Sequence, residues 1–162
     1  MSFKSGFVSI VGNPNVGKST LFNKLLNEDL SVVTNKPQTS RNKLLGIINH
    51  KNYQLILIDT PGYVNPSYKL HEYMNSKVFS SFEGSDLIIY VSDITEKKIN
   101  DKILSYVNKK NIPLYCIINK SDLIKNNTNI NIKKFESFKY KIMDIISCKS
   151  EKDIGIVKKK HN

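Results

Sequence analysis

Residues 12–19, Gly12-Asn13-Pro14-Asn15-Val16-Gly17-Lys18-Ser19, match the phosphate-binding pattern G-x-x-x-x-G-K-[ST]. An apolar, β-branched run at Phe7–Val11 precedes this loop and predicts a strand, and Gly17–Asn27 follows it and predicts a helix. The glycines let the backbone wrap around a phosphate, and the positive end of the helix points at the same place. Lys18 then reaches the β- and γ-phosphates, and the Ser19 hydroxyl is placed to bind Mg²⁺. The stretch therefore predicts a nucleotide-phosphate site.

Predicted strands and helices alternate along the rest of the chain, which is typical of a mostly parallel sheet with helices on both faces. Leu44–His50 and Tyr53–Asp59 are joined at Lys51-Asn52 and predict a strand pair. The other predicted strands are Leu87–Val91, Leu114–Ile118 and Ile142–Ile146, the predicted helices are Tyr68–Phe82, Glu96–Lys109 and Asn131–Tyr140, and the predicted loops are Ser31–Ser40 and Asn126–Asn131. We expect an α/β, three-layer fold with a mostly parallel six-stranded sheet and one antiparallel edge strand.

A second motif indicates which base the nucleotide carries. Asn119-Lys120-Ser121-Asp122 follows the predicted strand Leu114–Ile118. The Asp122 carboxylate can accept hydrogen bonds from N1–H and from the 2-amino group of guanine, whereas adenine has neither donor there. Because a buried carboxylate without a partner is unfavourable, this contact selects guanine over adenine nucleotides. With the phosphate loop, the motif predicts a P-loop GTPase fold that binds GTP and GDP.

Two further segments predict how magnesium and the γ-phosphate are held. Asp59-Thr60-Pro61-Gly62 ends a predicted strand, where Asp59 can hold Mg²⁺ through water and Gly62 can offer its N–H to the γ-phosphate. In the loop Pro37-Gln38-Thr39-Ser40-Arg41, the hydroxyl of either Thr39 or Ser40 can complete the Mg²⁺ shell, which would make the loop a nucleotide-sensitive switch. The candidate metal ligands are Ser19, Thr39 and Asp59, and the candidate catalytic residues are Lys18, Thr39 and Gly62.

The last motif is Ser147-Cys148-Lys149, which follows the last predicted strand and whose backbone N–H groups can brace the guanine O6. With it the set of candidate nucleotide-binding residues is complete. That set is Gly12, Asn13, Pro14, Asn15, Val16, Gly17, Lys18, Ser19 and Thr20, then Asp59, Thr60, Pro61, Gly62 and Tyr63, then Asn119, Lys120 and Asp122, and finally Ser147, Cys148 and Lys149.

The bulk composition fits one cytoplasmic domain. The chain has 162 residues and 40% hydrophobic residues, with no apolar run long enough to cross a membrane and no secretory signal at its start. Its two cysteines are too few for a disulfide framework. The net charge of +11 has two explanations that the sequence does not separate. It suits an anionic partner such as RNA or a lipid surface, and it also suits a base-composition bias, because Arg41 is the single arginine among 25 basic residues.

With these motifs in place, the chain resembles the Era family of translation-factor-related GTPases up to about Ser150. Four stretches carry the resemblance: Gly12–Asn23, Lys36–Lys43, Asp59–Tyr63 and Lys69–Met74. The resemblance implies a GTPase that acts in maturation of the small ribosomal subunit, contacts the end of its 16S rRNA and often associates peripherally with the inner membrane face. It also implies a potassium ion beside the phosphates, bound with the help of Asn15. Tyr63 stands where other GTPases carry a water-positioning glutamine, so slow unaided hydrolysis is expected.

The chain departs from this family in two places. Cys148 replaces the usual alanine of the guanine-bracing loop. The family continues into an RNA-binding KH domain, whereas here we expect a G domain at residues 1–150 and a short basic stub of the closing helix at residues 151–162, without a KH domain. Two hypotheses follow. In the first, the chain is a GTP-hydrolysing switch in small-subunit assembly. In the second, it is a low-turnover guanine-nucleotide-binding module or a truncated remnant without RNA-binding activity. We expect a monomer.

Overall fold

The computed structural model describes residues 3–26, 32–34, 44–97, 99–124, 136 and 141–159. In chain order its elements are β1 (Lys4–Val11), α1 (Lys18–Leu26), β2 (Val32–Thr34), β3 (Leu44–Asn49), β4 (Tyr53–Asp59), α2 (Lys69–Phe82), β5 (Leu87–Asp93), α3 (Asp101–Lys110), β6 (Leu114–Asn119), the 3-10 turn η1 (Ser121–Leu123), β7 (Lys141–Ile145) and α4 (Glu151–Lys159). The helix predicted at Asn131–Tyr140 and the loop predicted at Asn126–Asn131 lie outside the described residues, apart from Glu136.

The described strands form one sheet in the order β2-β3-β4-β1-β5-β6-β7. Strands β4, β1, β5, β6 and β7 pair in parallel, and β3 runs antiparallel to both of its neighbours. The predicted α/β fold class is therefore confirmed. The structure adds a seventh strand, β2, inside the segment predicted to be a loop. Its sequence, Val32-Val33-Thr34, is entirely β-branched and suits an extended backbone paired with β3.

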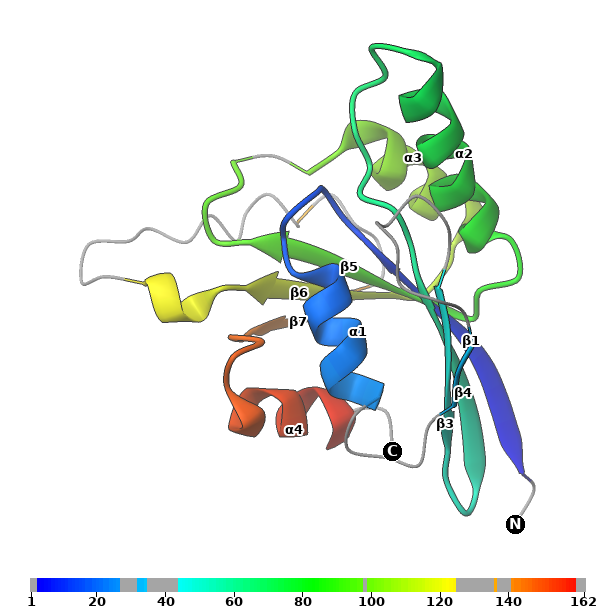
Figure 1. The fold of residues 1–162 in the computed structure, drawn as a ribbon, viewed down its shortest axis with the longest axis vertical. Helices are drawn as coiled ribbons and strands as arrows, with labels where there is room; N and C mark the ends of the chain where they lie inside the picture. Colours follow the sequence, from blue (N-terminus) through cyan, green and yellow to red (C-terminus); the bar gives the residue numbers. More distant parts are fainter. Residues whose placement is uncertain are drawn as a thin grey trace.

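Helices cover both faces of the sheet and give three layers (Figure 1). The central strands β5 and β6 are buried almost throughout, as expected of parallel strands with helices on either side. One core cluster contains side chains of α1 and α4, among them Phe22 and Ile154. The other contains side chains of α2 and α3, among them Phe82 and Ile103. This sandwich holds the strand ends, and the loops that follow them, in fixed relative positions.

Helix α3 begins five residues later than the predicted Glu96–Lys109. Asn100 stands just before it, and its Oδ1 accepts hydrogen bonds from the N–H groups of Lys102 at 3.0 Å and Ile103 at 3.3 Å. This side chain satisfies two of the donors that the first turn of a helix leaves unpaired, so it starts the helix there. Glu96 consequently lies in the turn after β5 and is available to the candidate site.

Helix α4 is part of the main core. Ile154 and Val157 are fully buried in the same cluster as α1, and Lys24 of α1 forms an ion pair with Glu151 of α4. The division of the chain near residue 150 stays a prediction, but the segment after it contributes directly to the packing of the sheet. None of the helices described for this chain combines the length and the apolar character that crossing a bilayer requires.

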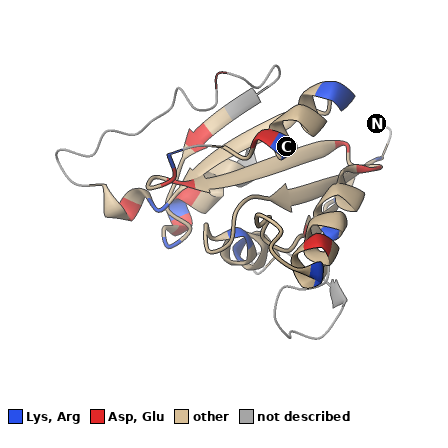
Figure 2. Cartoon of the chain, turned by 90° about the horizontal axis from the view of Figure 1, so that it is seen from above, with Lys and Arg blue, Asp and Glu red and all other residues tan. Residues whose placement is uncertain are grey.

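Charged residues of both signs lie around the described part of the molecule. In Figure 2, lysines and carboxylates occupy several different helices and loops, and in this view neither sign gathers on one element alone. The ion pairs Lys24–Glu151, Lys120–Asp93 and Lys149–Asp122 each join different elements. The lysines of the described residues are therefore not confined to one element, and three of them are paired with carboxylates.

Replacing Ile154 by alanine should destabilise the protein by about 3 kcal/mol, because it leaves a cavity at a fully buried position. The matched control is Ile156→Ala on the same helix, where the side chain is 40% exposed and the change should remain within about 1 kcal/mol. Urea denaturation followed by circular dichroism measures both. Equal midpoints for the two variants would show that α4 contributes little to the folded core.

Candidate nucleotide-binding site

The candidate site lies at the carboxyl ends of the parallel strands. The phosphate loop follows β1, Asp59 is the last residue of β4, Asn119 is the last residue of β6, and Ser147 lies shortly after β7. Because these strands are parallel neighbours, their carboxyl ends meet at one edge of the sheet, where ligands of open α/β folds bind. The structure thus brings the predicted motifs together.

The phosphate loop has glycine where neighbouring atoms come closest. Gly12 has φ +150°, and a Cβ there would lie 2.1 Å from the Val91 carbonyl oxygen of β5. Gly17 has φ +101°, and its Cβ would lie 2.2 Å from Nδ2 of Asn119. Asn15 also adopts the left-handed conformation, at φ 62°. The loop therefore packs so closely on the ends of β5 and β6 that side chains larger than hydrogen are excluded at two positions.

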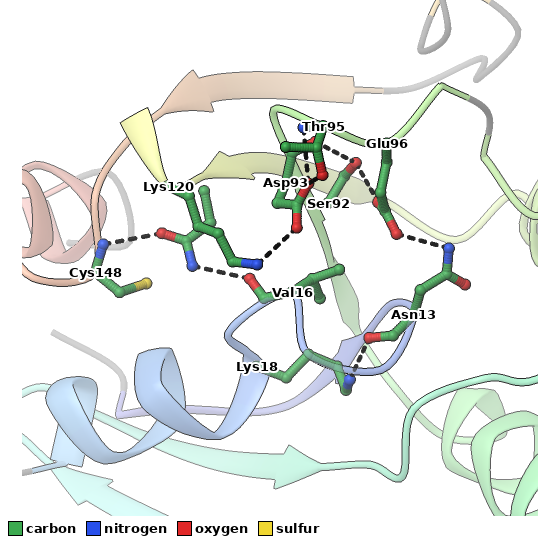
Figure 3. Close-up of polar contacts among 10 residues, drawn as sticks. Asn13, Val16, Lys18, Ser92, Asp93, Thr95, Glu96, Lys120 and Cys148 are labelled. Atoms are coloured by element: carbon green, nitrogen blue, oxygen red, sulfur yellow. Dashed lines mark hydrogen bonds and ion pairs between the residues drawn. The ribbon is translucent and has the colours of Figure 1, made fainter. Parts of the chain in front are cut away.

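Lys18 is buried with its charged end held by the loop itself. Its Nζ donates a 2.7 Å hydrogen bond to the Asn13 carbonyl oxygen, and the residue is 6% exposed (Figure 3). Burial lowers the pKa of Lys18 to about 8, and the nearby carboxylates of Asp59 and Glu96 only partly oppose this. The site therefore holds a cation that an anionic ligand would stabilise.

Ser19 and Asp59 form a pair of oxygen ligands beside the loop. The Ser19 hydroxyl donates to Oδ2 of Asp59 at 2.7 Å, while Oδ1 of Asp59 is buried and has no hydrogen-bond partner among the described residues. Burial raises the pKa of Asp59, and the hydrogen bond from Ser19 partly offsets this. A buried carboxylate oxygen without a partner is unfavourable, and Mg²⁺ prefers oxygen ligands, so this pair fits the predicted metal site. The third predicted ligand, Thr39, lies outside the described residues, as does Ser40.

The segment after Asp59 lies directly against the phosphate loop. The Thr60 hydroxyl donates to the Ile10 carbonyl oxygen at 2.8 Å, and a Cβ on Gly62 would lie 2.7 Å from the Pro14 nitrogen. The Tyr63 N–H donates to the Gly12 carbonyl oxygen at 3.1 Å. The Tyr63 side chain is 2% exposed and packs in the α2–α3 core. In this conformation the ring packs in the core and the N–H is paired with the phosphate loop, and a contact of Tyr63 with nucleotide stays a prediction.

Asn119 connects the phosphate loop to the last motif. Its Nδ2 donates to the Val16 carbonyl oxygen at 2.9 Å, and its Oδ1 accepts from the Cys148 N–H at 2.9 Å. The neighbouring Lys120 donates to Oδ2 of Asp93 at 2.7 Å (Figure 3). Burial raises the pKa of the Cys148 thiol to about 11, so Cys148 acts as a small uncharged residue. The predicted phosphate and base motifs therefore share one site.

Asp122 is placed as an ionised acceptor at the edge of the site. It accepts hydrogen bonds from the Lys149 Nζ and from the Ser147 hydroxyl, both at 2.7 Å. The hydrogen bond from Lys149, followed by that from Ser147, lowers the pKa of Asp122. The Ser147 N–H in turn donates to Asp153 of α4 at 2.8 Å. Because the Lys149 side chain is 79% exposed, its contact with Asp122 can give way to a ligand.

The turn after β5 contributes residues that motif analysis missed. Glu96 accepts from Nδ2 of Asn13 at 2.7 Å and from the Ser92 hydroxyl, and Asp93 accepts from the Thr95 N–H at 2.8 Å (Figure 3). These contacts join the turn to the phosphate loop and, through Lys120, to the base motif. A signal was available, because Asp93 ends a parallel strand just as Asp59 and Asn119 do.

A cavity of about 400 Å³ lies beside the phosphate loop. Its walls come from the loop, from the segment after Gly62 and from the residues before α3. The lining residues are Asn13, Pro14, Tyr63, Val64, Asn65, Ile99 and Asn100.

Proteins of known family are similar to this chain in sequence. A family model described as 50S ribosome-binding GTPase matches residues 7–120. The chain is 41% identical over 161 residues to GTPase Era of Ruminiclostridium cellulolyticum, covering 96% of this chain and 53% of that protein. It spans about half the length of the curated relatives that it matches.

Two solved structures of Era are similar to this chain. One is Era in complex with MgGDPNP and nucleotides 1506–1542 of 16S ribosomal RNA, with a TM-score of 0.75, 32% identity and coverage of 98% of this chain and 55% of that chain. The other is a variant of Aquifex aeolicus Era bound to GDP·AlF4⁻, with a TM-score of 0.75, 31% identity and coverage of 98% and 56%.

The lowered pKa of Lys18 predicts proton uptake when a phosphate binds. Below about pH 8 the lysine is already charged, and above it the free protein must take up a proton to present a cation. GDP affinity should therefore fall as pH rises above 8, and binding above that pH should be accompanied by uptake of part of a proton. Calorimetry in two buffers of different ionisation enthalpy measures this. Lys18→Arg, which stays protonated, is the control, and equal proton uptake in both proteins would contradict the assignment.

Proposed function

Because this chain belongs to the family of 50S ribosome-binding GTPases and is a G domain of the Era type, we propose that it binds guanine nucleotide with Mg²⁺ and hydrolyses GTP to GDP and phosphate. One observation carries the proposal. The Asn119 amide joins Val16 of the phosphate loop to Cys148 of the base-bracing loop, at 2.9 Å on each side. A nucleotide whose phosphates lie on the phosphate loop would therefore have its base close to the loop at Cys148.

The proposed phosphate contacts come from the loop backbone and from Lys18. The left-handed and glycine conformations of residues 12–17 suit a backbone that curves around an anion, and α1 begins at Lys18 directly behind it. The proposed metal ligands are Ser19 and Asp59, with Thr39 as the third. Bound Mg²⁺ would neutralise charge on the β- and γ-phosphates. The orphan oxygen of Asp59 supports this assignment.

The proposed guanine contact comes from Asp122. Neutral pH lies far above the pKa of this carboxyl, so it is ionised, as an acceptor of two hydrogen bonds must be. Ser147 and α4 orient it from one side. A ligand with donors in the guanine arrangement replaces the exposed Lys149, whereas adenine offers no donors that could take its place.

Substituting Asp122 by asparagine should therefore reverse the base preference. The amide offers a donor to the 2-oxo group of xanthine and loses the double acceptor for guanine, so GTP affinity should fall by roughly 100-fold while XTP binding improves. Competition binding with GTP and XTP measures the change. Lys149→Ala is the matched control, since it removes the ion pair but keeps the carboxylate and should keep the GTP preference. A variant that still prefers GTP would show that Asp122 does not contact the base.

Hydrolysis is proposed to be slow without a partner. The family resemblance identified Tyr63 at the water-positioning place, and the buried Tyr63 ring supports the expectation that this residue does not orient an attacking water. The potassium ion implied for the family would then supply charge beside the phosphates. Asn15 is its proposed protein ligand, exposed on the phosphate loop in a left-handed conformation.

A multiple-turnover assay of phosphate release separates an enzyme from a low-turnover binding module. We expect unaided turnover on the order of 10⁻³ s⁻¹ or below, faster in potassium than in sodium, and faster again with small ribosomal subunits. Asn15→Ala should remove the potassium effect, and Lys18→Ala should remove all turnover. Wild-type release no greater than that of Lys18→Ala, in every condition, would favour the binding module.

For the cellular role, we propose a switch in small ribosomal subunit assembly with rRNA as the partner. Era crystallised with a 16S rRNA fragment supports this, although the present chain matches only about half of that protein. The dispersed lysines of Figure 2 favour weak, salt-sensitive contacts to phosphates over sequence readout. Cytoplasmic location with peripheral contact at the inner membrane face is part of the same proposal.

A further inference from the structure

Helix α2 holds the segment after Gly62 through one buried amide. Oδ1 of Asn75 accepts from the Val64 N–H at 3.1 Å, and Nδ2 of Asn75 donates to the Val64 carbonyl oxygen at 2.7 Å. Asn75 is 7% exposed. One side chain thereby binds both polar groups of a single backbone residue, as a neighbouring strand would. None of the nucleotide motifs contains Asn75.

Tyr63 also holds this segment, between Gly62 and Val64. On one side the Tyr63 N–H donates to the Gly12 carbonyl oxygen, and the Tyr63 ring meets Phe79 of α2 edge to face at 5.9 Å. On the other side, the cavity of about 400 Å³ separates Val64 from the residues before α3. The Tyr63 ring is therefore held in the α2–α3 core, whereas Val64 faces the cavity on that side and is held from α2. The two hydrogen bonds of Asn75 fix the backbone two residues beyond Gly62.

We propose that Asn75 is a positioning residue that holds the Gly62 backbone in place for the γ-phosphate. This inference rests on the proposed function, in which the Gly62 N–H contacts that phosphate. Free rotation of the backbone after Gly62 would lower the fraction of molecules with the N–H correctly aimed, so the clamp preorganises the contact. The same clamp joins the γ-phosphate contact to α2, so a shift of the segment is passed to the helix.

A positioning role of Asn75 predicts different effects on the affinities for GDP and for a triphosphate, whereas a purely structural role predicts equal effects. GDP has no γ-phosphate, so its affinity depends on the phosphate loop and the base motif and should not require Asn75. A triphosphate analogue gains its additional contact at Gly62 and should require Asn75. The loss on removing the clamp is thus expected in the ratio of the two affinities and in the hydrolysis rate.

The experiment is calorimetric titration of the full chain with Mg²⁺ and either GDP or a non-hydrolysable GTP analogue. Asn75→Ala should weaken the analogue about tenfold, equivalent to about 1.4 kcal/mol, and leave GDP within twofold of wild type. Asn75→Asp has the same shape and keeps the acceptor for Val64 N–H but loses the donor. It should also weaken the analogue selectively, which keeps the proposal testable if the alanine variant does not fold. Ser76→Ala is the control on the same helix, since its hydroxyl bonds within its own turn.

The outcomes are distinct. Selective loss of analogue binding, with a parallel fall in hydrolysis, supports the positioning role. Equal weakening of GDP and analogue, or no change in either, overturns it while leaving the proposed function intact. A wild-type chain that binds neither nucleotide overturns the proposed function and this inference together.

Discussion

The side-chain amide of Asn119 is the interaction on which the rest of the site depends. It is nearly fully buried at the end of the central strand β6, and both of its polar ends bind backbone groups of other loops. Such an amide is stable only when both ends are paired, so the phosphate loop and the loop at Cys148 cannot separate without exposing or orphaning it. The same contact explains Gly17, because a Cβ there would collide with the amide. The relative position of the two loops and the need for glycine at residue 17 therefore follow from the same contact.

The charged groups around this amide stabilise the fold less than they prepare a site. Burial lowers the pKa of Lys18 and raises that of Asp59, because each charged form is less well solvated in the site than it would be in water. One Asp59 oxygen has no partner among the described residues. Groups arranged in this way are unfavourable in isolation and become favourable when an anion and a cation arrive together. The well-packed sandwich of helices and sheet offsets that local cost.

Sequence patterns predicted the parts of the site that rest on local chemistry. The phosphate loop, Asp59 and Asn119 are found where glycine spacing and strand ends indicated. Glu96 was missed because the predicted helix Glu96–Lys109 includes it. In the structure, the Asn100 cap starts α3 five residues later and leaves Glu96 in the turn after β5. Strand β2 was missed because three residues give too short a pattern. Asn75 was missed for a different reason, since a buried asparagine on an amphipathic helix gives no signal until its tertiary partner is known.

In this site, main-chain groups and the side chains that hold them in place come from different parts of the sequence. Gly12, Gly62 and Val64 contribute main-chain groups, and such residues are recognisable only when glycine is required. The side chains that hold those groups, Asn119 and Asn75, lie on regular elements at a distance along the chain. Both use a carboxamide, which donates and accepts without carrying charge into a site already crowded with it. An aspartate at Asn119 would add a buried negative charge to the site, and an alanine in either place would leave two backbone groups unpaired. Amide anchors on rigid elements are therefore the solution that the anionic ligand itself favours.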